Sequence, residues 1–107
     1  MKTLKGLKEV ICDFGGNPVR DADGISTITT KQILLQYLAG FFAKTEPEAF
    51  LAIDIGMKVY KAEDSINLED AEFALLKKAM NPPKHSVIVM KPIYDIINMA
   101  EKEDKPN

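Results

Sequence analysis

The sequence predicts a mainly α-helical α+β fold, with an N-terminal β-hairpin followed by about four helices packed as a small bundle. Three observations point to this fold class. Alternating apolar and polar residues broken by glycine-rich turns are confined to the N-terminal part of the chain. Apolar residues then recur at helical spacing in four later segments, separated by prolines or capping residues. Finally, 107 residues suffice for a single domain with its own hydrophobic core.

The β-hairpin is expected over residues 9–28, after a flexible leader at residues 1–8. Residues 9–14 alternate as a strand does, and the alternation places one set of side chains toward the core: Val10, Cys12 and Phe14. Residues 15–18 read Gly-Gly-Asn-Pro, which suits a tight turn and lets the chain return. A second turn at residues 21–24 ends the hairpin.

The helical bundle is expected over residues 29–100. Thr29 and Gln32 have the spacing of a capping box, so the first helix begins directly after Thr29. Thr45 and Glu48 repeat this spacing and predict the start of a second helix. The two helices should form an αα-hairpin with almost no loop.

The two later helices are predicted from their end signals. Asn67 can cap a third helix from Leu68, which two consecutive prolines end. The fourth helix is expected to become regular near Lys91, because Pro92 is tolerated in a first turn and costs about 3 kcal/mol deeper inside. Residues 86–90 are expected to be either extended or an irregular first turn. Residues 101–107 are charged and are expected to form a frayed tail.

The first two helices carry more apolar surface than a small core usually covers. On the second helix one face holds Phe50, Ile53, Met57 and Tyr60, and the opposite side holds Leu51, Ala52, Ile55 and Val59. A helix that is apolar nearly all round is either central in its fold or shared between subunits. Because aromatic residues and methionine are favoured in interface cores, we expect five residues at a contact: Tyr37, Phe41, Phe42, Met57 and Tyr60.

Composition excludes several classes of protein. The net charge is −2, which argues against a basic nucleic-acid binder. Apolar runs are only a few residues long, so no membrane span is expected. Cys12 has no second cysteine to pair with. Lys2, Lys5 and Lys8 are followed by Glu9 instead of an apolar segment, so no signal peptide is expected and a cytoplasmic location is predicted.

Side chains suited to catalysis are sparse, and no catalytic residue, cofactor or metal ligand is predicted. The single histidine, His85, is expected to be a solvated loop residue, and the thiol of Cys12 is expected to be buried and inert. Two alternatives stay open. One is an acid/base or cation-dependent enzyme that uses Glu63, Asp64, Glu69, Asp70 and Glu72. The other is a nucleic-acid-associated regulatory or packaging accessory that uses Lys2, Lys5, Lys8 and Arg20.

Residues 13–24, which read DFGGNPVRDADG and precede a capped leucine-rich helix, resemble the start of many small proteins encoded in tailed bacteriophages and prophages. Residues 52–68 and 74–78 look like their pattern of a helix, an acidic turn with one isoleucine or valine, and a second helix. The resemblance covers roughly residues 10–100 and departs from the pattern at Pro92. That group is largely without assigned activity, so the resemblance carries over no catalytic residue.

These features favour a non-enzymatic interaction or assembly module of phage or prophage origin that acts as a homo-oligomer in the cytoplasm of the host cell. Its expected partner is a second copy of the chain or a phage or host protein. Neither a nucleic acid nor a membrane is expected as its main partner.

Overall fold

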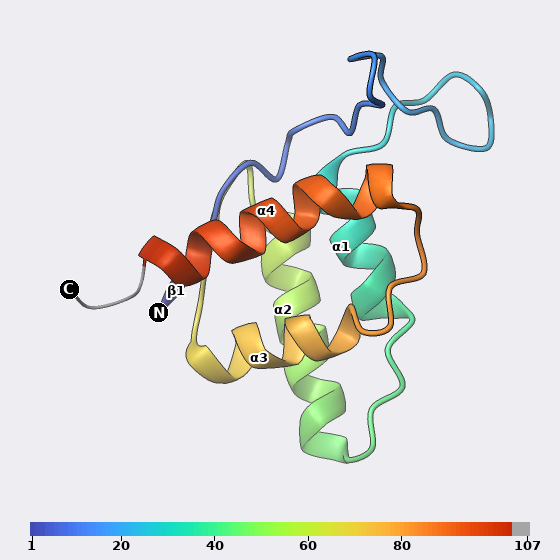
Figure 1. The fold of residues 1–107 in the computed structure, drawn as a ribbon. Helices are drawn as coiled ribbons and strands as arrows, with labels where there is room; N and C mark the ends of the chain where they lie inside the picture. The colour runs from blue at the N-terminus through green and yellow to red at the C-terminus, as the bar shows by residue number, and fades with distance from the viewer. Residues whose placement is uncertain (104–107) are drawn as a thin grey trace.

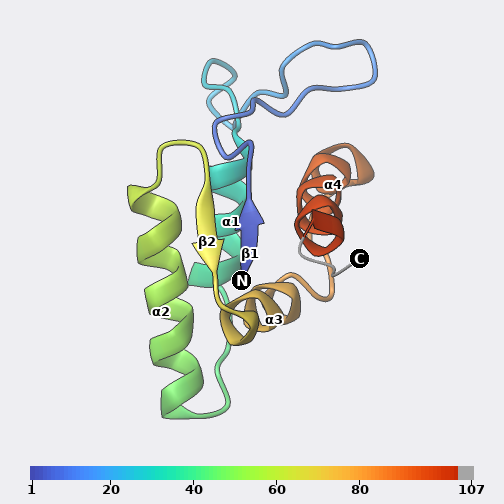
Figure 2. The same ribbon diagram turned by 90° about the vertical axis from the view of Figure 1, so that its left-hand side faces the viewer.

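A computed structural model describes residues 1–103, and within them four helices and two short strands confirm the predicted fold class. In chain order the elements are β1 (Lys2–Leu4), α1 (Thr30–Ala39), α2 (Glu46–Lys61), β2 (Ile66–Leu68), α3 (Asp70–Ala79) and α4 (Val87–Glu103). Helices α3 and α4 cross the α1–α2 pair (Figure 1). The two strands lie side by side between α2 and α4 (Figure 2). None of these helices is both long and apolar enough to cross a bilayer.

Every element contributes to one hydrophobic core. Side chains with no more than 1% exposure come from both strands and all four helices: Leu4, Ile33, Leu34, Ile55, Val59, Leu68, Leu76, Ile93 and Ala100. Helix α2 packs on α1 and α3, while α4 packs on β1. The small sheet therefore joins α4 to the rest of the bundle.

The N-terminal segment belongs to this core, so the prediction of a leader at residues 1–8 is wrong. Strand β1 pairs antiparallel with β2, with Leu4 opposite Ile66. Leu4 and Leu7 are both 0% exposed. The Leu7 N–H also donates to the Asp64 carbonyl at 2.9 Å. The lysines made this segment look polar, but the leucines between them face inward.

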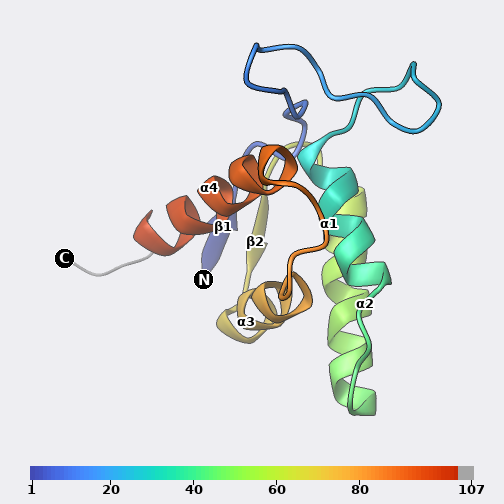
Figure 3. The same ribbon diagram turned by 45° about the vertical axis from the view of Figure 1, so that its right-hand side comes forward.

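Residues 9–28 make the predicted antiparallel turn, but their pairing consists of isolated bridges instead of regular strands. Cys12 pairs with Pro18, and the Val19 N–H donates to the Ile11 carbonyl at 2.8 Å. Figure 3 shows much of this segment extending away from the helices. Few neighbours are therefore available to continue the pairing into a sheet.

The side chains of this segment face the opposite way from the prediction. Ile11 is 1% exposed, whereas Phe14 is 91% exposed and Cys12 is exposed. The backbone of Ile11 pairs with Val19 and Ile28, and the side chains of all three pack on the core. Because strand side chains alternate, a shift of one residue exchanges the two faces.

Both predicted N-caps of the first two helices are confirmed. Thr29 Oγ1 accepts from the Gln32 N–H at 3.3 Å, and Gln32 Oε1 accepts from the Thr29 N–H at 2.8 Å. Thr45 Oγ1 accepts from the Glu48 N–H at 3.3 Å. The αα-hairpin is present, but its connection spans residues 40–45 and is longer than expected.

Helix α3 begins at Asp70, so the predicted start at Leu68 with Asn67 as cap is wrong. Ile66 and Leu68 are buried, while Asn67 between them is exposed and accepts from Thr3 Oγ1 at 2.7 Å. Pairing with β1 outweighs the local preference of asparagine for a helix cap. The distant strand therefore decides the structure of this segment.

Helix α4 is regular from Val87, so the prediction that it becomes regular only near Lys91 is wrong, and Pro92 lies inside the helix. The Val89 N–H donates to the Ser86 carbonyl at 3.1 Å, which closes a first turn before the proline. Pro92 removes one intrahelical donor, but the apolar residues around it are buried on the core side. Packing of this face offsets the lost hydrogen bond.

The last turn of α4 is held by ion pairs. Glu101 pairs with Lys77 of α3, and Glu103 lies 3.4 Å from Lys5 Nζ. Residues 101–103 are therefore helical and not frayed. The rest of the predicted frayed tail, residues 104–107, lies outside the described residues.

Glu72 is a buried carboxylate that links α2 to α3. It is 6% exposed and accepts from Lys58 Nζ at 2.8 Å and from the Glu69 N–H at 2.9 Å. Burial alone would raise the pKa of Glu72, but these hydrogen bonds and the charge of Lys58 lower it below the ordinary value of 4.5. Because the folded pKa is lower than the unfolded one, Glu72 stabilises the fold above the unfolded pKa. This contribution is lost as the pH falls through the folded pKa.

We therefore expect Glu72→Gln to lower the free energy of unfolding by about 1 kcal/mol at pH 7, because the ion pair with the half-exposed Lys58 is lost. The difference from the wild type should shrink as the pH falls below the ordinary pKa. Urea unfolding followed by circular dichroism at several pH values measures it. Glu63→Gln, in an exposed turn, is the matched control and should differ little at any pH. A difference that stays constant as the pH falls would contradict the role given to Glu72.

Candidate interaction surface

One face of helix α2 is apolar and exposed. Four residues spaced i, i+3, i+7 and i+10 form it, and we call them the α2 stripe: Phe50, Ile53, Met57 and Tyr60. Their exposed fractions are 58%, 59%, 48% and 69%, respectively. The opposite face, with Ala52, Ile55 and Val59, is buried. The predicted division of this helix into two apolar faces is thus confirmed, and only one of them lies in the core.

The α2 stripe faces outward because α2 stands at one side of the molecule (Figure 2). Its neighbours α1, α3 and β2 pack on the face opposite the stripe or on its flanks. An open groove of about 460 Å³ runs beside the stripe, between α1 and α2. Its lining is apolar and includes Leu35, Phe41, Ala49, Ile53, Gly56 and Met57. The stripe and the groove form one continuous apolar surface, since Ile53 and Met57 belong to both.

The five residues predicted at a contact differ in exposure, from buried through half-buried to exposed. Tyr37 is 4% exposed in the core, so the prediction that it lies at a contact surface is wrong. Phe41 is half-buried, packs on the core and lines the groove. Phe42 is 90% exposed in the connection between α1 and α2, and Met57 and Tyr60 lie on the α2 stripe. Phe50 and Ile53 lie on the same face as Met57 and Tyr60, as predicted, but were not among the residues expected at a contact. Their helical spacing was the signal that could have done so.

His85 is held in place and is not the solvated loop residue that was predicted. Its Nδ1 lies 2.8 Å from the Tyr37 hydroxyl, and its Nε2 lies 3.2 Å from Gln36 Oε1. The two rings of Tyr37 and His85 meet edge to face with centroids 5.2 Å apart. These contacts join the loop before α4 to helix α1.

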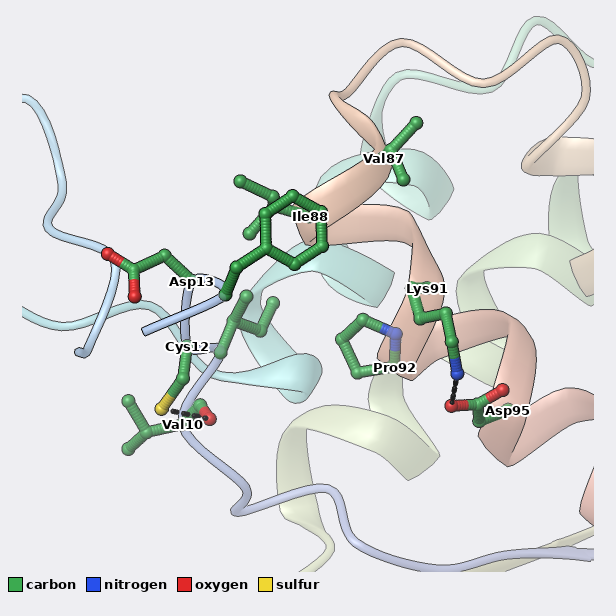
Figure 4. A pocket seen from close by; sticks show the side chains of 10 residues that line it. Val10, Cys12, Asp13, Val87, Ile88, Lys91, Pro92 and Asp95 are labelled. Carbon is green, nitrogen blue, oxygen red and sulfur yellow. Dashed lines mark hydrogen bonds and ion pairs between the residues drawn. The ribbon is translucent and has the colours of Figure 1, made fainter. Parts of the chain in front are cut away.

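A second pocket, of about 390 Å³, lies between the N-terminal turn and the start of α4 (Figure 4). Most of its lining is apolar, as at Val10 and Val87, and two of its three charged residues, Lys91 and Asp95, pair with each other at 2.6 Å. The Cys12 Sγ is directed toward the Val10 carbonyl, 3.6 Å away. No histidine lines this pocket. The thiol is exposed, contrary to the prediction.

Three of the five carboxylates in the acidic cluster are engaged with different partners. Asp64 Oδ1 accepts from the Lys8 N–H at 3.1 Å, and Asp70 Oδ1 lies 3.6 Å from Lys2 Nζ. Glu72 bonds to Lys58, as described above. Among residues 1–103, no three His, Cys, Asp or Glu side chains are grouped so that they could hold a metal ion.

Three of the four cations of the nucleic-acid alternative also have local partners. Lys2 Nζ lies 5.7 Å from the centre of the Phe73 ring, and Lys5 pairs with Glu103. Arg20 donates to the Ile25 carbonyl at 2.9 Å. Within residues 1–103, the structure therefore adds no feature that favours the enzyme alternative or the nucleic-acid alternative.

Comparison with protein-family models, with curated proteins and with solved structures finds no match to this chain. The fold and the surface therefore define its class: a small α+β domain, with four helices in residues 1–103, whose second helix carries an exposed apolar face.

Proposed function

We propose that this protein is a non-enzymatic interaction or assembly module that associates with copies of itself through the α2 stripe. The observation that carries the proposal is the exposure of four large apolar side chains on one helix face, each by about half or more. Contiguous exposed apolar patches are typical of protein–protein contact sites. Phe, Tyr and Met are also enriched in the cores of such sites.

The exposed area supports self-association. From their exposed fractions, the α2 stripe and Phe42 together present on the order of 600 Å² of side-chain surface. Stable interfaces bury about 800 Å² on each partner. Exposed alanines beside the groove, Ala39 and Ala43, can supply part of the difference. A second copy can bury the same patch on both subunits at once, as twofold interfaces do.

The phage or prophage origin implied by the resemblance, and a location in the cytoplasm of the host cell, belong to the same proposal. Both this origin and this location are compatible with a small protein that assembles with itself. A phage or host protein that binds the same surface would be a different result from the one we propose.

Multi-angle light scattering across a range of concentrations tests the proposal. We expect a mass that rises to at least twice the 11.9 kDa of one chain. Met57→Glu should weaken association at least tenfold, because it places a charge in the buried contact. Met99→Glu is the matched control, since Met99 is exposed to a similar degree, 54% against 48%, but lies on α4. A wild type that stays monomeric at every concentration would overturn the proposal. Equal weakening by the two variants would also do so.

A further inference from the structure

We infer that two copies pair α2 against α2 in antiparallel orientation, so that Phe50 of one copy packs on Tyr60 of the other and Ile53 packs on Met57. The inference rests on the proposed self-association and specifies its geometry. Three features of α2 support it: the spacing of the stripe, the room around Gly56 and the distribution of charge along the helix.

The spacing of the α2 stripe reads the same in both directions. Successive members are three, four and three residues apart, from Phe50 to Tyr60. A twofold axis midway between Ile53 and Met57 therefore places each stripe residue of one helix opposite a stripe residue of its antiparallel copy. Twofold interfaces need such a self-complementary patch. The outer pairs then bring one aromatic ring against another, Phe50 against Tyr60. The inner pairs, near the axis, bring the aliphatic Ile53 against the thioether of Met57.

Gly56 leaves room for a close approach near this axis. A Cβ built at Gly56 would meet no atom within 4 Å, so the space beside it is open. Ala49, about two helical turns earlier, lines the same side of the groove. Small residues on one flank let two helices approach closely and allow the large side chains to interdigitate. A glycine inside a helix costs about 1 kcal/mol relative to alanine. Close packing of the second helix at Gly56 would offset this cost.

Charge along α2 favours the antiparallel orientation over the parallel one. The first turn carries Glu46 and Glu48, and the last turn carries Lys58 and Lys61. Glu48 already pairs with Lys78, and Lys58 with Glu72. Glu46 and Lys61 make no ion pair within residues 1–103. Antiparallel pairing brings Glu46 of one copy near Lys61 of the other, whereas parallel pairing brings like charges together at both ends. The helix dipoles favour the same orientation.

Disulfide cross-linking tests the register, in a background in which the exposed Cys12 is replaced by serine. Two cysteines must have Cα atoms within about 7 Å to form a bond. We expect an equimolar mixture of Phe50→Cys and Tyr60→Cys chains to give covalent dimers on oxidation, at concentrations where the wild type associates. Each variant alone should give almost none, because identical positions lie about 15 Å apart along the paired helices. Ile53→Cys mixed with Met57→Cys should also cross-link.

Several results would overturn the inference. Cross-linking of Phe50→Cys with itself would indicate parallel helices, and no cross-link in either mixture would exclude pairing through α2. A second test is charge exchange: Glu46→Lys should weaken association about 3- to 10-fold, and adding Lys61→Glu should restore it. In a parallel pair neither change would have this effect. Failure of the geometry is distinguishable from failure of the proposed function, since the first leaves an oligomer with other contacts and the second leaves a monomer.

Discussion

Replacing Leu7 with alanine is expected to lower the free energy of unfolding by about 2 to 5 kcal/mol, and Leu4→Ala should do the same. Both side chains are 0% exposed, so each substitution leaves a cavity in the core. A domain of this size has a total stability of about 5 to 15 kcal/mol. The double variant should therefore be largely unfolded at room temperature. Urea unfolding followed by circular dichroism at 222 nm measures all three effects.

Lys5→Ala is the matched control because it lies between the two leucines. Lys5 makes a single surface ion pair with Glu103, and its side chain is 63% exposed. Its replacement should change stability by no more than about 0.5 kcal/mol. If the leucine variants unfolded at the same urea concentration as the wild type, residues 1–8 would be a leader after all and the assignment of β1 to the core would fail.

Features encoded within one or two helical turns could be predicted from the sequence. The capping threonines Thr29 and Thr45 lie within three residues of the N–H groups that they bond, so local spacing identifies them. The two faces of α2 follow from its periodicity in the same way. The candidate surface was predictable to this extent, since the period alone shows which residues share a face with Met57 and Tyr60.

Features that depend on distant partners could not be predicted. Strand β1 pairs with β2 across more than half of the chain, and neither three-residue strand has a local signal of its own. Without β1, residues 66–68 look like the start of the next helix. Pro92 is similar, because its position inside α4 is tolerated through packing that the local sequence does not display. The burial of one apolar face of α1 likewise depends on the loop and the helix that follow much later in the chain. For this reason Tyr37 was wrongly predicted to lie at a contact surface.

The hydroxyl of Tyr37 explains why an aromatic residue expected at a contact surface is buried. It accepts from the Lys84 N–H at 2.7 Å, and it lies 2.8 Å from His85 Nδ1 and 3.3 Å from Met90 Sδ. A hydroxyl has one proton and two acceptor sites. When His85 is neutral with its proton on Nε2, that N–H donates to Gln36 and the Tyr37 hydroxyl donates to Nδ1. When His85 is charged, Nδ1–H donates to the hydroxyl, which can then donate to Met90.

We expect Tyr37→Phe to lower the free energy of unfolding by about 1 to 3 kcal/mol, because the half-buried Lys84 N–H loses its acceptor. It should also change the tautomer of neutral His85, since Nδ1 loses its donor. In the wild type the proton should reside mainly on Nε2, and in Tyr37→Phe the Nδ1 tautomer should gain population. Nitrogen-15 chemical shifts of the imidazole ring report this change directly.

Tyr94→Phe separates this effect from the general loss of a tyrosine hydroxyl. Tyr94 is 40% exposed on α4 and lines the same pocket as His85, but its hydroxyl bonds to no other residue in the described part of the chain. Its replacement should alter stability by less than about 0.5 kcal/mol and leave the imidazole shifts unchanged. If Tyr37→Phe left the tautomer unchanged while lowering stability, the hydroxyl would act only on the Lys84 backbone. His85 would then be oriented by Gln36 and by the edge of the Tyr37 ring alone.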